Sequence, residues 1–199
     1  MFTRRIALAG IPFLAFPALA GPAAAQQGPA ALIEGFHTTL LDIMRNAQRL
    51  GARGRYDRLA PVMSQVFDLN AMTRIAVGPS WTSFSAADQQ ALTEAFSRWS
   101  IATYAARFDG FAGETFTTQG TQTLPNGDQL VRTTLNRTGN QDPVILSYLV
   151  RNSRVVDVYL TGTISELASR RSEFAGLIRD GGAGRLTQEL TRRANGLLG

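Results

Sequence analysis

Cysteine is absent from the sequence. Disulfides need pairs of thiols, and a bacterial lipoprotein carries its lipid on a cysteine at the mature N-terminus, so both are excluded. The stability of the fold must therefore come from a hydrophobic core. The 174 residues after residue 25 (199 minus 25) can form one, because a domain of about 150 residues buries roughly 70% of its unfolded surface.

Lysine is also absent, and all 20 basic residues are arginine. This bias is typical of a GC-rich genome, so an arginine at any one site carries little chemical information by itself. The net charge is +5 for the whole chain, and +3 once Arg4 and Arg5 are set aside (18 minus 15). The arginines are dispersed along the chain, whereas nucleic-acid binding needs a basic cluster, so no nucleic-acid partner is expected.

Histidine occurs once, as His37. Zinc sites use histidine and cysteine at short spacings, and serine hydrolases need a histidine base, so neither chemistry is expected. His37 follows Phe36, off the centre of an apolar stripe, which favours a partly exposed structural role. The glycine-rich segment 181–184 lies between two predicted helices and has no lysine, which favours a helix break over a phosphate-binding loop. No metal and no cofactor are expected.

Only one stretch is long and apolar, and it lies at the N-terminus. Arg4 and Arg5 precede the uncharged residues 6–19, which are too short and too interrupted by proline to span a membrane. Small residues then offer cleavage after Ala25, with Ala20 as an alternative. We expect residues 1–25 to be a signal peptide, exported by the Sec or the Tat route. The mature domain, residues 26–199, is then expected in the periplasm, soluble and without a lipid anchor.

The hydrophobic periodicity divides this mature chain into three parts. Spacings of three and four residues predict helices over 30–50, 56–66, 69–77 and 86–107, with breaks at Gly51 and Gly54 and a possible kink at Pro61. A period of two then predicts strands over 115–122, 129–137, 143–150 and 154–161. Helices return over 165–179 and 185–195. The short connections require antiparallel strands, so the sequence predicts a single α+β domain with a curled sheet of about four strands.

Two features could carry a site. Large apolar side chains gather near the long helix and the start of the sheet, and a sheet curled around a helix readily encloses an apolar cavity. Asp157 is the one acid within the apolar strand that begins at Val155, so it could be a base with a raised pKa. Strand alternation favours the other interpretation, in which Asp157 faces solvent and pairs with an arginine.

Several segments together resemble the MlaC, or Ttg2D toluene-tolerance, family. These are Phe67-Asp68-Leu69, Gly78-Pro79-Ser80-Trp81, the VVDVYLTGTISEL segment (155–167), RRSEF (170–174) and IRDGG (178–182). The resemblance covers most of the mature chain. The sequence TISEL (163–167) is more similar to the hopanoid-associated branch, HpnM, than to the phospholipid branch.

The resemblance implies an NTF2-like α+β fold with an apolar cavity between sheet and helices that holds lipid tails. It implies a monomeric carrier, not an enzyme, that moves a phospholipid or hopanoid from an inner-membrane ABC or RND-type complex to or from an outer-membrane lipoprotein complex. Two alternatives remain open at this point: an NTF2-like enzyme with Asp157 as base, and an adaptor that binds membrane-complex proteins without lipid. The expected lipid-binding residues are Ile75, Trp81, Phe96, Trp99, Phe108, Leu146, Tyr148, Val156, Val158 and Leu160.

Overall fold

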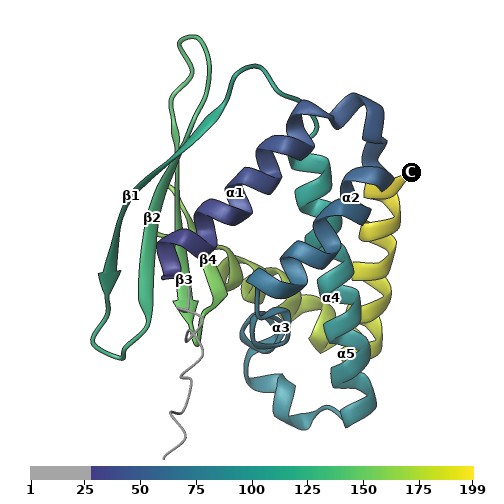
Figure 1. The fold of residues 1–199 in the computed structure, drawn as a ribbon. Helices are drawn as coiled ribbons and strands as arrows, with labels where there is room; N and C mark the ends of the chain where they lie inside the picture. Colours follow the sequence, from purple (N-terminus) through teal and green to yellow (C-terminus); the bar gives the residue numbers. More distant parts are fainter. Residues whose placement is uncertain (1–27) are drawn as a thin grey trace, which may run out of the picture.

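The computed structural model describes residues 28–199, so the expected signal peptide, residues 1–25, lies outside the described residues. Helices form one layer and an antiparallel sheet forms the other (Figure 1). The helices are α1 (Pro29–Arg45), α2 (Ala47–Val66), α3 (Leu69–Val77), α4 (Ala86–Arg107) and α5 (Glu166–Leu198), with a 3-10 turn, η1 (Gly78–Ser83), between α3 and α4. None of these helices in residues 28–199 is both long and apolar enough to cross a membrane.

The sheet follows the chain order β1-β2-β3-β4-β5. Its strands are β1 (Thr115–Thr123), β2 (Gln129–Asn136), β3 (Val144–Arg151), β4 (Arg154–Leu160) and β5 (Ile164–Ser165), and each neighbouring pair is antiparallel. The predicted α+β class and antiparallel sheet are confirmed. The fifth strand is additional to the four expected, because a tight turn after Leu160 folds two residues back onto β4 before α5 begins.

The boundary between the first two helices differs from the predicted one. Helix α1 ends at Arg45, and α2 runs from Ala47 with non-helical dihedral angles at Gly51, where φ is 61°. Gly54 and Pro61 lie inside α2, and only Gly51 has non-helical dihedral angles there, so the predicted break at Gly54 is wrong and the helix continues through Pro61. Pro61 is exposed, where solvent can hydrogen-bond the carbonyl that loses its helical partner.

Helix α5 bends back on itself at the predicted glycine break. Gly181 and Gly182 have non-helical dihedral angles, and Gly182 has a φ of 61° and a ψ of −152°. Beyond the break, Arg193 forms an ion pair with Glu173, 20 positions earlier, so the two halves of α5 lie against each other. Both halves place an arginine over the Trp99 ring of α4, Arg170 at 4.8 Å and Arg193 at 6.0 Å.

The core lies between the two layers, where α1 packs against β1 and β2. The largest fully buried side chains are Tyr148 on the sheet, Phe36 on α1, Phe67 after α2 and Phe174 on α5. Phe36 meets the edge of Phe67 at 5.1 Å between ring centroids and lies 6.5 Å from Tyr148. Aromatic rings thus join the sheet to the helical layer.

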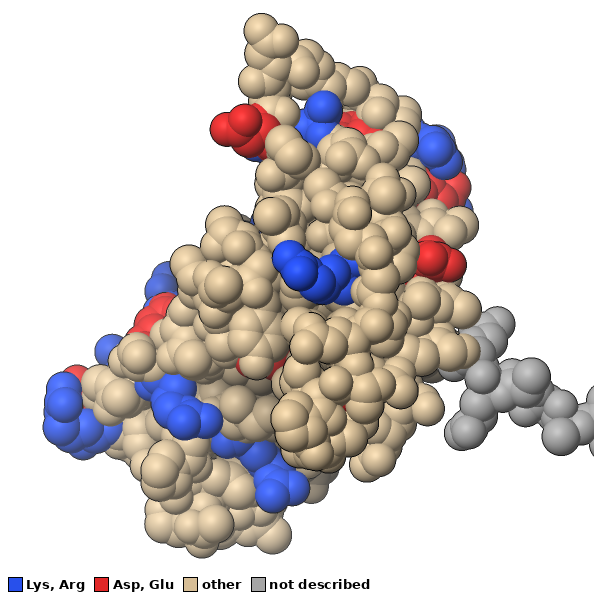
Figure 2. Space-filling view, turned by 90° about the vertical axis from the view of Figure 1, so that its left-hand side faces the viewer, with Lys and Arg blue, Asp and Glu red and all other residues tan. Residues whose placement is uncertain are grey.

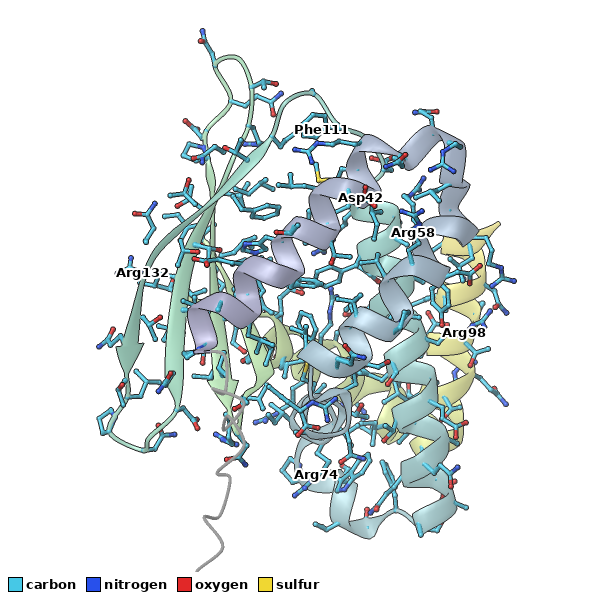
Figure 3. All side chains as sticks on the ribbon, in the orientation of Figure 1. Asp42, Arg58, Arg74, Arg98, Phe111 and Arg132 are labelled. Carbon is cyan, nitrogen blue, oxygen red and sulfur yellow. The ribbon has the colours of Figure 1, made fainter. Side chains whose placement is uncertain are left out.

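Charges are scattered over the surface. Figure 2 looks onto the side of the molecule that the sheet occupies and shows arginines in several separate places, with wide uncharged areas between them. Figure 3 shows one ion pair on the surface, between Asp42 of α1 and Arg58 of α2. The carboxylate oxygen and the guanidinium nitrogen lie 2.7 Å apart. The structure therefore shows no single continuous basic face on this side.

Candidate functional site

An apolar cavity of about 110 Å³ lies between the sheet and the helical layer. It receives side chains from α2, α3, α4, β3, β4 and α5, so distant parts of the chain build it together. Its lining residues are Met63, Phe67, Leu69, Met72, Phe96, Trp99, Ser100, Thr103, Tyr104, Arg107, Phe108, Leu146, Tyr148, Val158, Leu160, Glu166, Leu167 and Arg170.

Strands β3 and β4 form the apolar floor of this cavity. Leu146 pairs with Leu160 and Tyr148 pairs with Val158 across the two strands. Residues directly opposite in an antiparallel pair point to the same face, so these four side chains form one patch toward the helices. The Tyr148 hydroxyl does not reach solvent, and burial raises the pKa of that phenol well above its usual value.

Helix α4 forms the opposite wall. Phe96, Trp99 and Phe108 contribute apolar surface, and Phe96 and Trp99 both pack edge-on near Phe174 of α5. Tyr104 lies among the rings of Phe36, Phe67 and Phe108. The wall is therefore aromatic over most of its length.

The charged and hydroxyl-bearing lining residues of the helices come from α4 and α5, and we call this set the polar edge: Ser100, Thr103 and Arg107 of α4, and Glu166 and Arg170 of α5. The α4 residues follow helical spacings of three and four from Phe96, so they share one helix face with the aromatic residues of the wall. Arg170 donates to Glu166 at 3.2 Å and to Glu173 at 3.0 Å. Apolar walls with a single polar edge suit a ligand that is apolar over most of its length and polar at one end.

Seven of the ten residues that the sequence predicts for the site line the cavity, namely Phe96, Trp99, Phe108, Leu146, Tyr148, Val158 and Leu160. Three do not. Ile75 is half-buried elsewhere, and its carbonyl accepts a hydrogen bond from Arg171 at 2.9 Å. Trp81 lies in the η1 turn and lines a separate groove with Arg74.

Val156 is the third residue outside the lining. The register between β3 and β4 shifts so that Leu149 pairs with Asp157 while Val150 pairs with Val155, which leaves Val156 as the extra residue of a bulge. A bulge reverses the alternation on one side of it. Val155 and Val158 consequently reach the core, and Val156 is buried outside it.

The prediction that His37 is partly exposed is wrong. The side chain is 3% exposed because the curved sheet covers this part of α1. Its ring stacks on Phe116 with centroids 3.9 Å apart, and its Nε2 lies 3.0 Å from the Tyr148 hydroxyl. Burial lowers the pKa of His37 from its usual 6.5 to about 4. This hydrogen bond with His37 thus holds the hydroxyl end of Tyr148, a residue that lines the cavity.

The prediction that Asp157 faces solvent beside an arginine is also wrong. The residue is 6% exposed, and its carboxylate accepts hydrogen bonds from the Val158 amide (2.8 Å), the Ser165 hydroxyl (2.5 Å) and the Leu167 amide (3.3 Å). Strand β5 and the start of α5 cover it, and it satisfies an amide of the first helical turn. Asp157 is not among the cavity residues.

The sequence interpretation missed eleven lining residues. Those on α4 continue the spacing of Phe96 and could have been found by extending that stripe to its polar end. Those from Met63 to Met72 span a helix end, where periodicity changes and gives no common face. The missed residues are Met63, Phe67, Leu69, Met72, Ser100, Thr103, Tyr104, Arg107, Glu166, Leu167 and Arg170.

Comparison with known proteins identifies the family of this chain. The family model described as MlaC protein matches residues 34–192, which include every residue that lines the cavity. The chain belongs to the MlaC family. A search of curated proteins gives no significant match.

A solved structure shows the same fold as this MlaC-family chain. It is a phospholipid-binding protein from Ralstonia solanacearum, in complex with a phospholipid. The two chains are 24% identical with a TM-score of 0.73, and the match covers 85% of this chain and 98% of the other. At this level of identity the likeness establishes the arrangement of helices and sheet. The predicted resemblance to the MlaC family is confirmed, whereas its hopanoid-associated branch stays a prediction.

Proposed function

We propose that this protein is a periplasmic carrier that binds the acyl chains of a phospholipid in the cavity between the sheet and α4. The observation that carries the proposal is the cavity itself, with apolar walls and one polar edge. Membership of the MlaC family supports it, as does the shared fold with a protein that was solved in complex with a phospholipid. No catalytic step is part of the proposal.

A carrier of this kind has a clear physical task. Exposing an acyl chain of about 16 methylenes to water would cost a free energy of roughly 12 kcal/mol, at about 0.8 kcal/mol per methylene. The aromatic and aliphatic walls would cover this surface while the polar head stays at the polar edge.

Binding must enlarge the cavity. Its volume of about 110 Å³ is small beside the about 300–1,000 Å³ that ligand sites usually measure. Side chains alone can yield little of this difference in a close-packed interior. We therefore infer that the sheet and the helical layer separate when a chain enters.

The wider role follows from the same proposal. The export signal expected over residues 1–25 and the absence of cysteine from the sequence support a carrier that diffuses between the two membranes. Its partners would be an inner-membrane ABC or RND-type complex and an outer-membrane lipoprotein complex. A hopanoid remains the alternative lipid.

Co-purification tests the proposal directly. Native mass spectrometry of the purified protein, followed by organic extraction, should reveal one or more lipid molecules per chain. Protein stripped of lipid should regain it from phospholipid vesicles. A protein that is empty and takes up no lipid from vesicles would overturn the proposal.

A further inference from the structure

His37 joins α1 to two strands of the sheet. Its Nε2 lies 3.0 Å from the Tyr148 hydroxyl of β3, and its ring stacks on Phe116 of β1 with centroids 3.9 Å apart. Figure 1 shows α1 lying beside this part of the sheet. The contact therefore spans the boundary between the helical layer and the sheet, and we call it the His37 contact.

The other hydrogen bonds between the two layers within residues 28–199 end at β4. The Asp68 amide donates to the Val155 carbonyl at 2.9 Å, and the Arg154 guanidinium donates to two carbonyls at the end of α2. Strand β4 then leads through β5 into α5. The sheet is thus attached to the helices along β4, and the His37 contact holds its β1–β3 side.

The surroundings of His37 are uncharged. The side chain is 3% exposed, Tyr148 is the titratable group in contact with it, and Tyr104 of α4 lies beyond a phenylalanine ring. Burial alone lowers the pKa of His37 to about 4. Charged side chains of the adjoining elements lie outside the contact, namely Glu34, which is exposed, Glu114, which accepts a hydrogen bond from the Ala112 amide, and Arg132, which points away from the helical layer (Figure 3).

A proton added to His37 in this contact has no counter-charge. Burial raises the pKa of Tyr148 well above its usual value, so the phenol stays neutral in acid. An unpaired buried charge is costly, whereas an imidazolium in contact with water is not. Water reaches the ring once α1 and the sheet separate. Acid therefore favours the separated arrangement over the closed one.

From this geometry we propose that the His37 contact is an acid-sensitive latch on the cavity. Neutral His37 keeps α1 on β1 and β3, and protonated His37 releases the sheet to turn away about β4. Tyr148 lines the cavity, so release at this contact widens it. The latch is a property of the lipid-free protein. Its consequence rests on the proposed lipid-carrier function, because an open cavity exchanges lipid faster.

Proton linkage gives the size of the effect. The pKa of His37 is about 4 in the closed arrangement and returns to its ordinary 6.5 when water reaches the ring. Lowering the pH from 7.5 to 5.0 should therefore raise the ratio of open to closed protein about 30-fold. Since His37 is the only histidine, no second imidazole titrates in this interval.

Because the chain has no cysteine, introduced cysteines can carry spin labels that report this opening. Labels at Thr38→Cys on α1 and Gln122→Cys on β1 span the two layers. Labels at Thr38→Cys and Glu94→Cys on α4 form the control pair within the helical layer, and all three residues are exposed. Pulsed double electron resonance on lipid-free protein should show longer α1–β1 distances at pH 5.0 than at pH 7.5. The control distance should not change.

Two variants of His37 remove the charge in different ways. His37→Gln can still hydrogen-bond Tyr148, and His37→Leu keeps an apolar contact with Phe116. Both should give the same α1–β1 distances at the two pH values, and either one suffices if the other folds poorly. Circular dichroism at pH 5.0 verifies that the helices persist.

Lipid transfer measures the consequence for the carrier. Protein loaded with a fluorescent phosphatidylethanolamine is mixed with phosphatidylcholine vesicles, whose head group does not titrate between pH 5.0 and 7.5. The unmodified protein should transfer its lipid faster at pH 5.0, by up to about 30-fold. The two His37 variants should transfer it at the same rate at both pH values.

The outcomes separate the latch from the carrier. Equal α1–β1 distances at the two pH values would overturn the latch, as would opening that persists in both His37 variants, a change in the control pair or loss of the helical signal at pH 5.0. Transfer by the unmodified protein at equal rates would also overturn the latch and leave the carrier intact. Opening in acid without any lipid transfer would overturn the carrier and leave the latch in place.

Discussion

The His37 Nε2 lies 3.0 Å from the Tyr148 hydroxyl, and this hydrogen bond joins α1 to β3 across 111 positions of the chain. The histidine is buried, and its pKa is lowered to about 4 because burial disfavours the charged ring. The unfolded chain, with a histidine pKa of about 6.5, therefore binds a proton at higher pH than the folded protein does.

This difference predicts a specific pH dependence. Stability from His37 is complete above pH 6.5 and is lost as the pH falls from about 6.5 toward 4, by about 3 kcal/mol in total. Urea unfolding between pH 7.5 and 4.5 measures it. Because His37 is the only histidine, His37→Gln should remove most of the slope between pH 6.5 and 5. An unchanged slope in that variant would assign the effect to other groups.

Filling the cavity should block lipid uptake. Leu146→Trp places a large ring against the helical wall, and overpacking of this kind costs about 1–3 kcal/mol. We expect at least about tenfold less extractable lipid per protein. The neighbouring Ile145 is 39% exposed and on the opposite face of β3, so Ile145→Trp should bind lipid normally. Equal lipid content in the two variants would argue against the cavity as the site.

Asp157 should act on stability and not on lipid binding. Its carboxylate accepts hydrogen bonds from the Val158 amide of β4 and from Ser165 and Leu167 at the start of α5. In Asp157→Asn, one oxygen becomes an amide that faces donors, so unfolding should become easier by about 1–3 kcal/mol. Lipid content should remain normal in the folded fraction. Normal stability combined with loss of a chemical turnover would instead favour the enzyme alternative.

The bend in α5 offers a test with a matched pair of glycines. Gly182 has a φ of 61° and a ψ of −152°, a region that is essentially limited to glycine, so Gly182→Ala should cost about 1–3 kcal/mol. Gly184 is helical with open space beside it, and Gly184→Ala should stabilise by about 0.4–1 kcal/mol. Thermal unfolding of both variants measures the contrast. Similar shifts for both would mean that the bend is not fixed by Gly182.

Local sequence patterns predict most elements of this fold because each element shows its own period. The helix predicted over 86–107 has those bounds in the structure, since Ser85 caps its first turn through the Asp88 amide. The β3–β4 turn at Asn152 and Ser153 has positive φ at both residues, as a tight two-residue hairpin requires. The turn after Leu160 also has positive φ, at Thr161 and Gly162, but three residues separate the paired Leu160 and Ile164. The sequence does not predict this turn, because β5 is only two residues long before α5 begins.

The site is harder to predict than the elements, because it depends on which faces meet. A single-residue bulge removes Val156 from the cavity, and no local signal in VVDVYL indicates it. His37 is buried only because β1 and β3 bring Phe116 and Tyr148 to it. Trp81 looks like a cavity residue by size alone, yet the η1 turn holds it at a different groove. Periodicity predicts which side chains share one face of a helix or strand. Only the tertiary fold determines which residues that face packs against.

Strand β1 forms one edge of the sheet and has the sequence TFTTQGTQT. The register shift between Thr118 and Gly120 interrupts its ladder, and threonine and glutamine side chains keep its surface polar. Bulges and polar side chains prevent edge strands from adding a foreign strand. The opposite edge, β5, is only two residues long. A sheet protected in this way offers a neighbouring molecule no regular edge strand with which to pair, so the polar sequence of β1 also limits aggregation.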